Sequence, residues 1–274
     1  MLLAIDIGNT NITLGLFPAA PAAPRRSGPP APPKALQTWR LSTRSHLTAD
    51  DYGPSLRSLL QSAGLDPDRL AGVAVASVVP ALDPVFREVA DRYLGRPALF
   101  VGPGVVTGVR VLVDAPAAVG ADRIVNAAAA FARKRRACIV VDFGTATTFD
   151  CVSAGGDYRG GVIAPGPVMA AEGLARRTAK LPHVGVFRRP ARALGTNTLD
   201  SIAAGLYHGY VGLTREILRR LLAEMKGRPA ILATGGLAPL IGPEIGDIKE
   251  IVPDLTLEGL WLIWRLNQGK HRGA

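Results

Sequence analysis

Short apolar runs alternate along the chain with longer stretches in which apolar residues recur at helical spacing. Continuous apolar runs are typical of buried strands, and the runs at 2–7, 72–79 and 138–142 fit that pattern. Further strands are predicted at 12–17, 36–41, 98–101, 160–164 and 230–234, and helices at 48–63, 84–94, 120–135, 167–178, 201–225 and 257–267. This order of strands and helices predicts an α/β fold.

One device occurs twice in the sequence: an apolar strand that ends in Asp, a turn rich in Gly and Thr, and a second strand. DIGNTN at 6–11 and DFGTATT at 142–148 are the two copies. The echo predicts two domains of like fold, 1–118 and 119–274, with the C-terminal helix packing back. Within the first, residues 18–34 are rich in Pro and Ala, so we expect an extended mobile loop without a functional role.

Composition narrows the class of protein. The chain has 274 residues, 48% hydrophobic and 20% charged, which is ordinary for a globular protein. No apolar run reaches the length of a membrane span, and the N-terminal segment, with Asp6 at its centre, does not read as a signal peptide. Cys138 and Cys151 form no CxxC pair, so two buried thiols in a reducing cytoplasm are expected and a zinc site is not.

The net charge of +10 suits an anionic partner, either nucleic acid or a phosphate-bearing ligand. Its basic clusters are short and scattered, at 133–136, 176–177 and 188–189, and no aromatic residues are interleaved with them. Stacking on aromatic side chains is a common feature of nucleic-acid surfaces. A bias of the coding sequence toward Arg explains most of the excess, and nucleic acid is not the expected partner.

The turn at residues 6–10, Asp–Ile–Gly–Asn–Thr, contains groups that can bind a nucleotide. A carboxylate at a strand end can hold Mg²⁺, and Gly8 lets the backbone approach phosphate while turn N–H groups and side chains donate to its oxygens. An ordinary hairpin turn explains the same residues equally well. Thr145, Thr147 and Thr148 offer donors in the second copy, and Gly235–Gly236 forms a third turn that suits the flat face of an adenosine.

Asp122 stands at the start of a long predicted helix, where a carboxylate is normally a cap. Beside a bound hydroxyl it could instead accept a proton as a general base, and Arg123 could bind a substrate carboxylate. Spacing alone favours the cap.

Seven segments together resemble type III pantothenate kinases: DIGNTN at 6–11, GADRIVNA at 120–127, DFGTATT at 142–148, GGVIAPG at 160–166, AKLP at 179–182, GTNT at 195–198 and ATGGLA at 233–238. The resemblance implies two duplicated ribonuclease-H-like domains with mixed five-stranded sheets and an ATP cleft between them. It implies transfer of the γ-phosphate of ATP to pantothenate, in a cytoplasmic homodimer that needs Mg²⁺ and a monovalent cation, K⁺ or NH₄⁺. Thr196 stands where many members have Lys, and Val113 where some have Tyr.

The resemblance also implies a role for individual residues. Asp122 is implied as the catalytic base and Asp142 as a ligand of the monovalent cation, with Asp6 toward Mg²⁺. ATP-binding residues are implied at Asp6, Ile7, Gly8, Asn9, Thr10, Asn11, Ile12, Thr13 and Thr145. Pantothenate-binding residues are implied at Gly120, Ala121, Asp122, Arg123 and Thr198.

Two other functions fit the sequence less well. A relative retired from catalysis, acting as an accessory factor in transcription, would be free to lose Asp6, Asp122 or Asp142, and all three are present. The resemblance implies the acetate and sugar kinase/Hsp70/actin superfold. A kinase of that superfold acting on a sugar or another acid is disfavoured, because GADR and GTNT both belong to the pantothenate pocket in the family that the chain resembles.

Overall fold

A computed structural model describes residues 1–19, 32–177, 182 and 187–268 of the chain. Its contacts divide into two compact units, Met1–Arg133 with Asp254–Ala274, and Lys134–Pro253. Most of the Pro/Ala-rich segment predicted at 18–34 lies outside the described residues.

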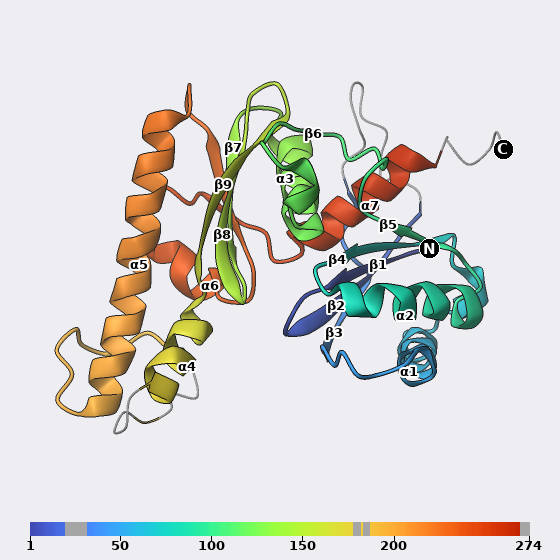
Figure 1. Ribbon diagram of the computed structural model, residues 1–274, viewed down its shortest axis with the longest axis horizontal. Helices are drawn as coiled ribbons and strands as arrows, with labels where there is room; N and C mark the ends of the chain where they lie inside the picture. Colours follow the sequence, from blue (N-terminus) through green and yellow to red (C-terminus); the bar gives the residue numbers. More distant parts are fainter. Residues whose placement is uncertain (20–31, 178–181, 183–186, 269–274) are drawn as a thin grey trace. The chain divides into compact units, whose positions relative to one another are not determined.

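The first unit contains a mixed sheet in the order β3-β2-β1-β4-β5 (Figure 1). β1 pairs antiparallel with β2 and parallel with β4, while β2–β3 is antiparallel and β4–β5 parallel. The strands of this sheet are β1 (Leu2–Ile7), β2 (Asn11–Phe17), β3 (Gln37–Ser42), β4 (Gly72–Ser77) and β5 (Ala98–Phe100). The unit also contains the short strand β6 (Arg110–Val111), which is not part of this sheet. Its helices are α1 (Ala49–Ser62), α2 (Asp83–Glu88), α3 (Ala121–Lys134, whose last residue falls in the second unit) and α7 (Leu255–Asn267).

Helices cover both faces of this sheet because its central strands are apolar on both sides. Leu3, Ile5 and Ile7 pack in one core with α1 and α2. Leu2 and Ala4 point to the other face, where they pack with α3 and α7. Burial on both faces fixes the strand register, since a slip of one residue would exchange the two cores.

The second unit repeats the arrangement. Its own strands lie in the order β9-β8-β7-β10-β11, with antiparallel pairs β7–β8 and β8–β9 and parallel pairs β7–β10 and β10–β11. They are β7 (Cys138–Phe143), β8 (Ala146–Val152), β9 (Asp157–Pro165), β10 (Ala230–Thr234) and β11 (Glu250–Ile251). The helices are α4 (Pro167–Arg177), α5 (Thr198–Glu224) and α6 (Ala238–Ile241).

The order of strands along the chain and across the sheet is therefore the same in both units, which confirms the α/β fold with repeated sheets that the motif echo predicts. The structure corrects two details. The chain holds sheets of five and six strands, where the sequence predicts five in each. One unbroken helix, α5, begins at Thr198, three residues before the predicted start.

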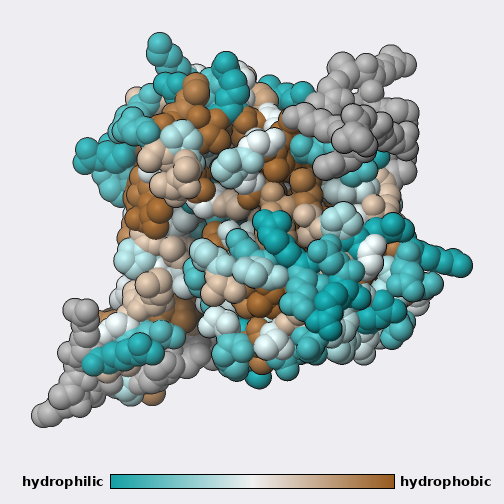
Figure 2. All heavy atoms as spheres, turned by 45° about the vertical axis from the view of Figure 1, so that its right-hand side comes forward, coloured by the Kyte–Doolittle hydropathy of each residue, from teal (hydrophilic) through white to brown (hydrophobic). Residues whose placement is uncertain are grey.

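Hydrophobic side chains also reach the surface, where they form patches between hydrophilic ones on the face drawn in Figure 2. Leu194 and Ile163 are among the most exposed, at 81% and 62%. None of the helices that the structure describes combines the length and the apolar character needed to cross a membrane.

Candidate functional site

The first polar turn joins β1 to β2 at the end of β1 where its parallel partner β4 also ends. The N–H of Gly8 donates to the carbonyl of Asn11 at 3.0 Å and closes the turn. Asp6 is half-buried beside it, while Asn9, Thr10 and Asn11 are exposed. Carboxyl ends of parallel strands are where open α/β sheets bind ligands, so the turn is placed to meet one.

Two of the residues implied in ATP binding have their side chains in the core instead. Ile7 and Ile12 are fully buried with the residues that face α1 and α2. They therefore fix the turn from beneath, and only their backbone groups can reach a ligand. Thr13 is half-buried and lies opposite Asp6 in the β1–β2 register, so the two side chains share a face of the sheet.

Thr43 braces this turn, and the sequence analysis did not find it. Its hydroxyl donates to the carbonyl of Gly8 at 2.6 Å, and its N–H donates to the carbonyl of Thr10 at 3.0 Å. The turn carbonyls are thus tied to the residue after β3, while Asn9 and Thr10 themselves are exposed. No local signal marks Thr43, because 35 residues separate it from Gly8.

Asp122 lies at the same edge of the same sheet, in the first turn of α3. A Cβ placed on Gly120 would come within 2.5 Å of its Oδ1 and 3.4 Å of Val78 Cγ1. Val78 directly follows β4 and donates its N–H to the carbonyl of Ile7 at 3.0 Å. The carboxylate and the Asp6 turn therefore belong to one edge, and Gly120 lacks a side chain where Asp122 needs the space.

The environment of Asp122 raises the affinity of its carboxylate for a proton. Burial raises the pKa of Asp122, and this effect outweighs the opposing hydrogen bond from the Arg123 N–H, 2.8 Å from Oδ1, and the Arg123 charge. A carboxylate that is only half solvated is a better proton acceptor than an exposed one. Gly120, Ala121 and Arg123 are likewise half-buried, as residues lining a pocket would be.

In the second unit, parallel pairing brings two of the predicted turns together. Asp142, at the end of β7, lies opposite Thr234, at the end of β10. Gly235 follows with a φ of +90°, and a Cβ there would collide with Asp142 Oδ1 and the backbone of Phe143. Asp142 is half-buried and Thr145 is exposed at the tip of the β7–β8 turn.

The structure changes the set of donors in this turn. Thr147 is fully buried, and its hydroxyl has no hydrogen-bond partner among the described residues. Thr148 donates to the buried carboxylate of Asp150 at 3.1 Å, and Tyr158 donates to the same carboxylate at 2.8 Å. The expectation that Thr147 and Thr148 supply donors to a ligand is therefore wrong, while Thr145 is exposed at the tip of the turn.

Thr198 is the first residue of α5 and is exposed. The GTNT segment before it has a local explanation, because the Asn197 side chain accepts from the N–H of Asp200 at 2.9 Å and caps the helix. Asp200 is in turn held by Arg188 at 3.0 Å. This cap fixes Thr198 at a defined place in the second unit.

A metal ion bound at these turns would need oxygen atoms of the bound substrate to complete its coordination shell. Over the described ranges, no three His, Cys, Asp or Glu side chains gather into a metal site. Mg²⁺ commonly takes one or two carboxylates and completes its shell with phosphate oxygens and water. The single half-buried carboxylates of Asp6 and Asp142, each at a strand end, fit ions that arrive with a phosphate ligand, and Gly235 leaves free the space that Asp142 needs.

Comparison with known proteins points to one family. The family model described as type III pantothenate kinase matches residues 2–220. The chain is 48% identical over 272 residues to the type III pantothenate kinase of Koribacter versatilis (strain Ellin345), with 99% of this chain and 98% of that protein covered.

Solved structures share the fold. A Baf-family transcriptional activator from Campylobacter jejuni aligns over 97% of this chain and 99% of its own, with a TM-score of 0.57 and 16% identity. A ROK-family glucokinase from Streptomyces griseus, solved with glucose and AMPPNP, aligns over 97% and 98% with a TM-score of 0.54 and 14% identity.

Replacing Thr43 by Val should loosen the first turn while keeping the shape of the side chain. We expect faster hydrogen exchange at the Gly8 and Thr43 amides and a loss of about 1 kcal/mol in the free energy of unfolding. Thr38→Val, at an exposed position of β3, the strand that Thr43 follows, is the matched control. Equal exchange at Gly8 in both variants would show that Thr43 does not hold the turn.

Proposed function

The chain belongs to the type III pantothenate kinase family, and from that premise we propose how its own residues carry out the reaction. The reaction is the ATP-dependent phosphorylation of pantothenate to 4'-phosphopantothenate in coenzyme A biosynthesis. One structural observation carries the assignment of roles: a half-buried carboxylate, Asp122, at the sheet edge that also bears the Asp6 turn.

Asp122 acts as the general base in a direct in-line transfer. Its carboxylate accepts the proton of the primary hydroxyl of pantothenate as the oxygen attacks the γ-phosphorus of ATP. The bond from γ-phosphorus to the bridging oxygen breaks, and ADP leaves with that electron pair. Gly120, Ala121, Arg123 and Thr198 bind pantothenate, with Arg123 suited to the substrate's carboxylate because a guanidinium forms paired hydrogen bonds with it.

The polar turns bind ATP. N–H groups of Asp6–Thr13 and the side chains of Asn9, Thr10, Asn11 and Thr13 donate to the phosphates, and Thr145 adds a hydroxyl. Asp6 faces Mg²⁺ and Asp142 a monovalent cation, K⁺ or NH₄⁺. When bound, these ions offset the negative charge that the transferred phosphate carries.

We propose duplicated domains at 1–118 and 119–274 and a homodimeric, cytoplasmic protein. The exposed side of α5 supports the dimer. Gly205, Gly209 and Gly212 have no side chains on this side, and nothing lies within 4 Å of where their Cβ atoms would be. Glycine inside a helix costs about 1 kcal/mol relative to Ala, so three of them suit close approach of another surface.

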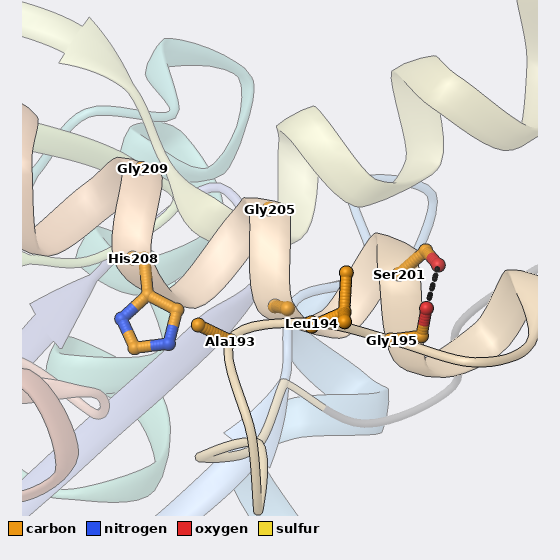
Figure 3. A pocket seen from close by; sticks show the side chains of 8 residues that line it. Ala193, Leu194, Gly195, Ser201, Gly205, His208 and Gly209 are labelled. Carbon is orange, nitrogen blue, oxygen red and sulfur yellow. Dashed lines mark hydrogen bonds between the residues drawn. The ribbon is translucent and has the colours of Figure 1, made fainter.

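A groove of about 530 Å³ runs along this side of the helix. Figure 3 shows Ala193, Leu194 and Gly195 on a segment that passes beside the first turns of α5, near Ser201 and His208. Leu194 is 81% exposed, which is an unusual state for a leucine beside such a groove. A second copy of the chain would cover it.

An assay of ADP release tests the proposed reaction. With ATP, Mg²⁺ and pantothenate, turnover should depend on pantothenate and should rise when K⁺ replaces Na⁺. Asp142→Asn should remove most of the response to K⁺, with Asp157→Asn, on the same sheet at β9, as the control. The proposed function would be refuted if the folded protein showed no pantothenate-dependent turnover under any cation. If Asp142→Asn kept the wild-type response to K⁺, only the role of Asp142 as a cation ligand would be refuted.

Asp122→Asn should lower turnover roughly 10²- to 10⁴-fold, because the amide cannot accept the proton. The raised pKa of Asp122 moves the acidic limb of the wild-type rate profile to higher pH than an exposed Asp would give. The same shift destabilises the folded protein above the unfolded-state pKa. The variant should therefore be at least as stable as wild type at neutral pH, with the difference closing in acid.

Asp114→Asn, in the exposed loop before the same helix, is the control and should leave turnover unchanged. A near-wild-type rate for Asp122→Asn would exclude it as the base.

Gly209→Leu should fill the α5 groove and weaken the dimer, which sedimentation velocity would detect as a shift toward monomer. Gly173→Leu, in α4 where a Cβ also meets nothing, is the matched control and should leave the assembly unchanged. A Gly209→Leu protein with wild-type sedimentation would place any dimer contact elsewhere.

A further inference from the structure

A second charged cavity lies in the second unit, away from the polar turns. It has a volume of about 520 Å³, within the range typical of small-molecule sites. Four cationic side chains and one acidic side chain line it, a net of three positive charges: Lys134, Arg136, Arg228, Lys249 and Asp247. We propose that this cavity binds a small organic phosphate.

The cavity sits at the amino ends of the three parallel strands of this unit. Arg136 precedes β7, Arg228 precedes β10, and Lys249 precedes β11. The turns assigned to ATP follow the carboxyl ends of the same strands. β10 has five residues, so its two ends are about 15 Å apart and the cavity is a separate site.

Most of the positive charge here has no partner among the described residues. Lys134 forms an ion pair with Glu250. For Arg136, Arg228 and Lys249, no ion pair or hydrogen bond from the side chain is found within the described part of the chain. Three unpaired cations around one hollow repel one another, and a dianion bound among them would remove that repulsion.

Helix ends supply an alternative reason for cations at this place. α3 ends at Lys134 and α5 ends at Glu224, and terminal carbonyls attract positive charge. Arg136 and Arg228 lie two and four residues beyond those ends and donate to no described carbonyl. Their guanidinium groups are therefore available to a ligand, and their paired N–H donors match phosphate oxygens.

The rest of the lining determines what else the ligand carries. Leu222, Pro229 and Ile231 form an apolar wall, so the phosphate should be attached to a partly apolar body. No aromatic side chain lines the cavity on which a nucleic-acid base could stack. A small phosphate ester fits these features better than a nucleic acid strand.

Equilibrium dialysis with 1-naphthyl phosphate, at physiological salt, tests the proposal with the full chain. The wild-type protein should bind this probe more tightly than inorganic phosphate, because the latter lacks an apolar body. Arg136→Gln/Arg228→Gln should weaken that binding roughly tenfold or more. Arg69→Gln/Arg159→Gln removes the same charge from exposed sites elsewhere and should leave it unchanged.

Asp247→Asn should change the affinity for the probe in the opposite direction. Removing the one acidic group of the lining should tighten binding roughly twofold to fivefold, which mere damage to the fold would not do. Turnover of pantothenate should stay at the wild-type level in all of these variants, so a failure here is distinguishable from a failure of the kinase assignment.

The proposal is overturned if Arg136→Gln/Arg228→Gln binds the probe as wild type does, or if both double variants lose binding equally. A single-stranded oligonucleotide that binds in an Arg136- and Arg228-dependent manner, while naphthyl phosphate does not, would also overturn it in favour of nucleic acid.

Discussion

The register of two parallel strand pairs decides where every candidate functional group lies. Asp6 is opposite Ala76 in the pair β1–β4, and Asp142 is opposite Thr234 in the pair β7–β10. Both pairs are buried on their two faces, so neither can slip without turning apolar side chains outward. Because parallel strands end together, this register delivers a carboxylate and a following turn to one edge of each sheet. Asp122 and Gly235 then reach those edges from elements that come later in the chain.

The placement of Asp122 at this edge has a free-energy cost. Asp122 is held where water is partly excluded, and burial raises its pKa although a backbone N–H and Arg123 oppose the change. A helix cap needs no such burial, since an exposed Asp at that position stabilises a helix as well. Gly120 gives up a side chain to make the space. This partly buried environment is one that the proton transfer proposed for Asp122 can use and that helix capping does not require.

The sequence predicted the architecture because its signals are local and repeated. An apolar strand, an Asp and a Gly/Thr turn are all read within ten residues, and finding them twice was enough to infer the duplicated order of strands. The donors at the site were less predictable. Whether Thr147 points to solvent depends on which face of β8 it occupies, and the strand pairing that decides this is not visible in DFGTATT. Thr43 could not be found at all, because its contact with Gly8 joins segments far apart in the sequence.

The same limit applies to charge, and it changes how the basic excess should be interpreted. Counted along the chain, the clusters at 133–136 and 188–189 are alike. In space, Arg188 and Arg189 are neutralised by Asp200 and Glu244, and Arg133 and Lys134 by Glu258 and Glu250. Arg136 has no such partner among the described residues, and it lines a hollow with two further cations for which none is found there. A coding bias toward Arg explains how many basic residues the chain has, but it does not explain why Arg136, Arg228 and Lys249 lie around one hollow.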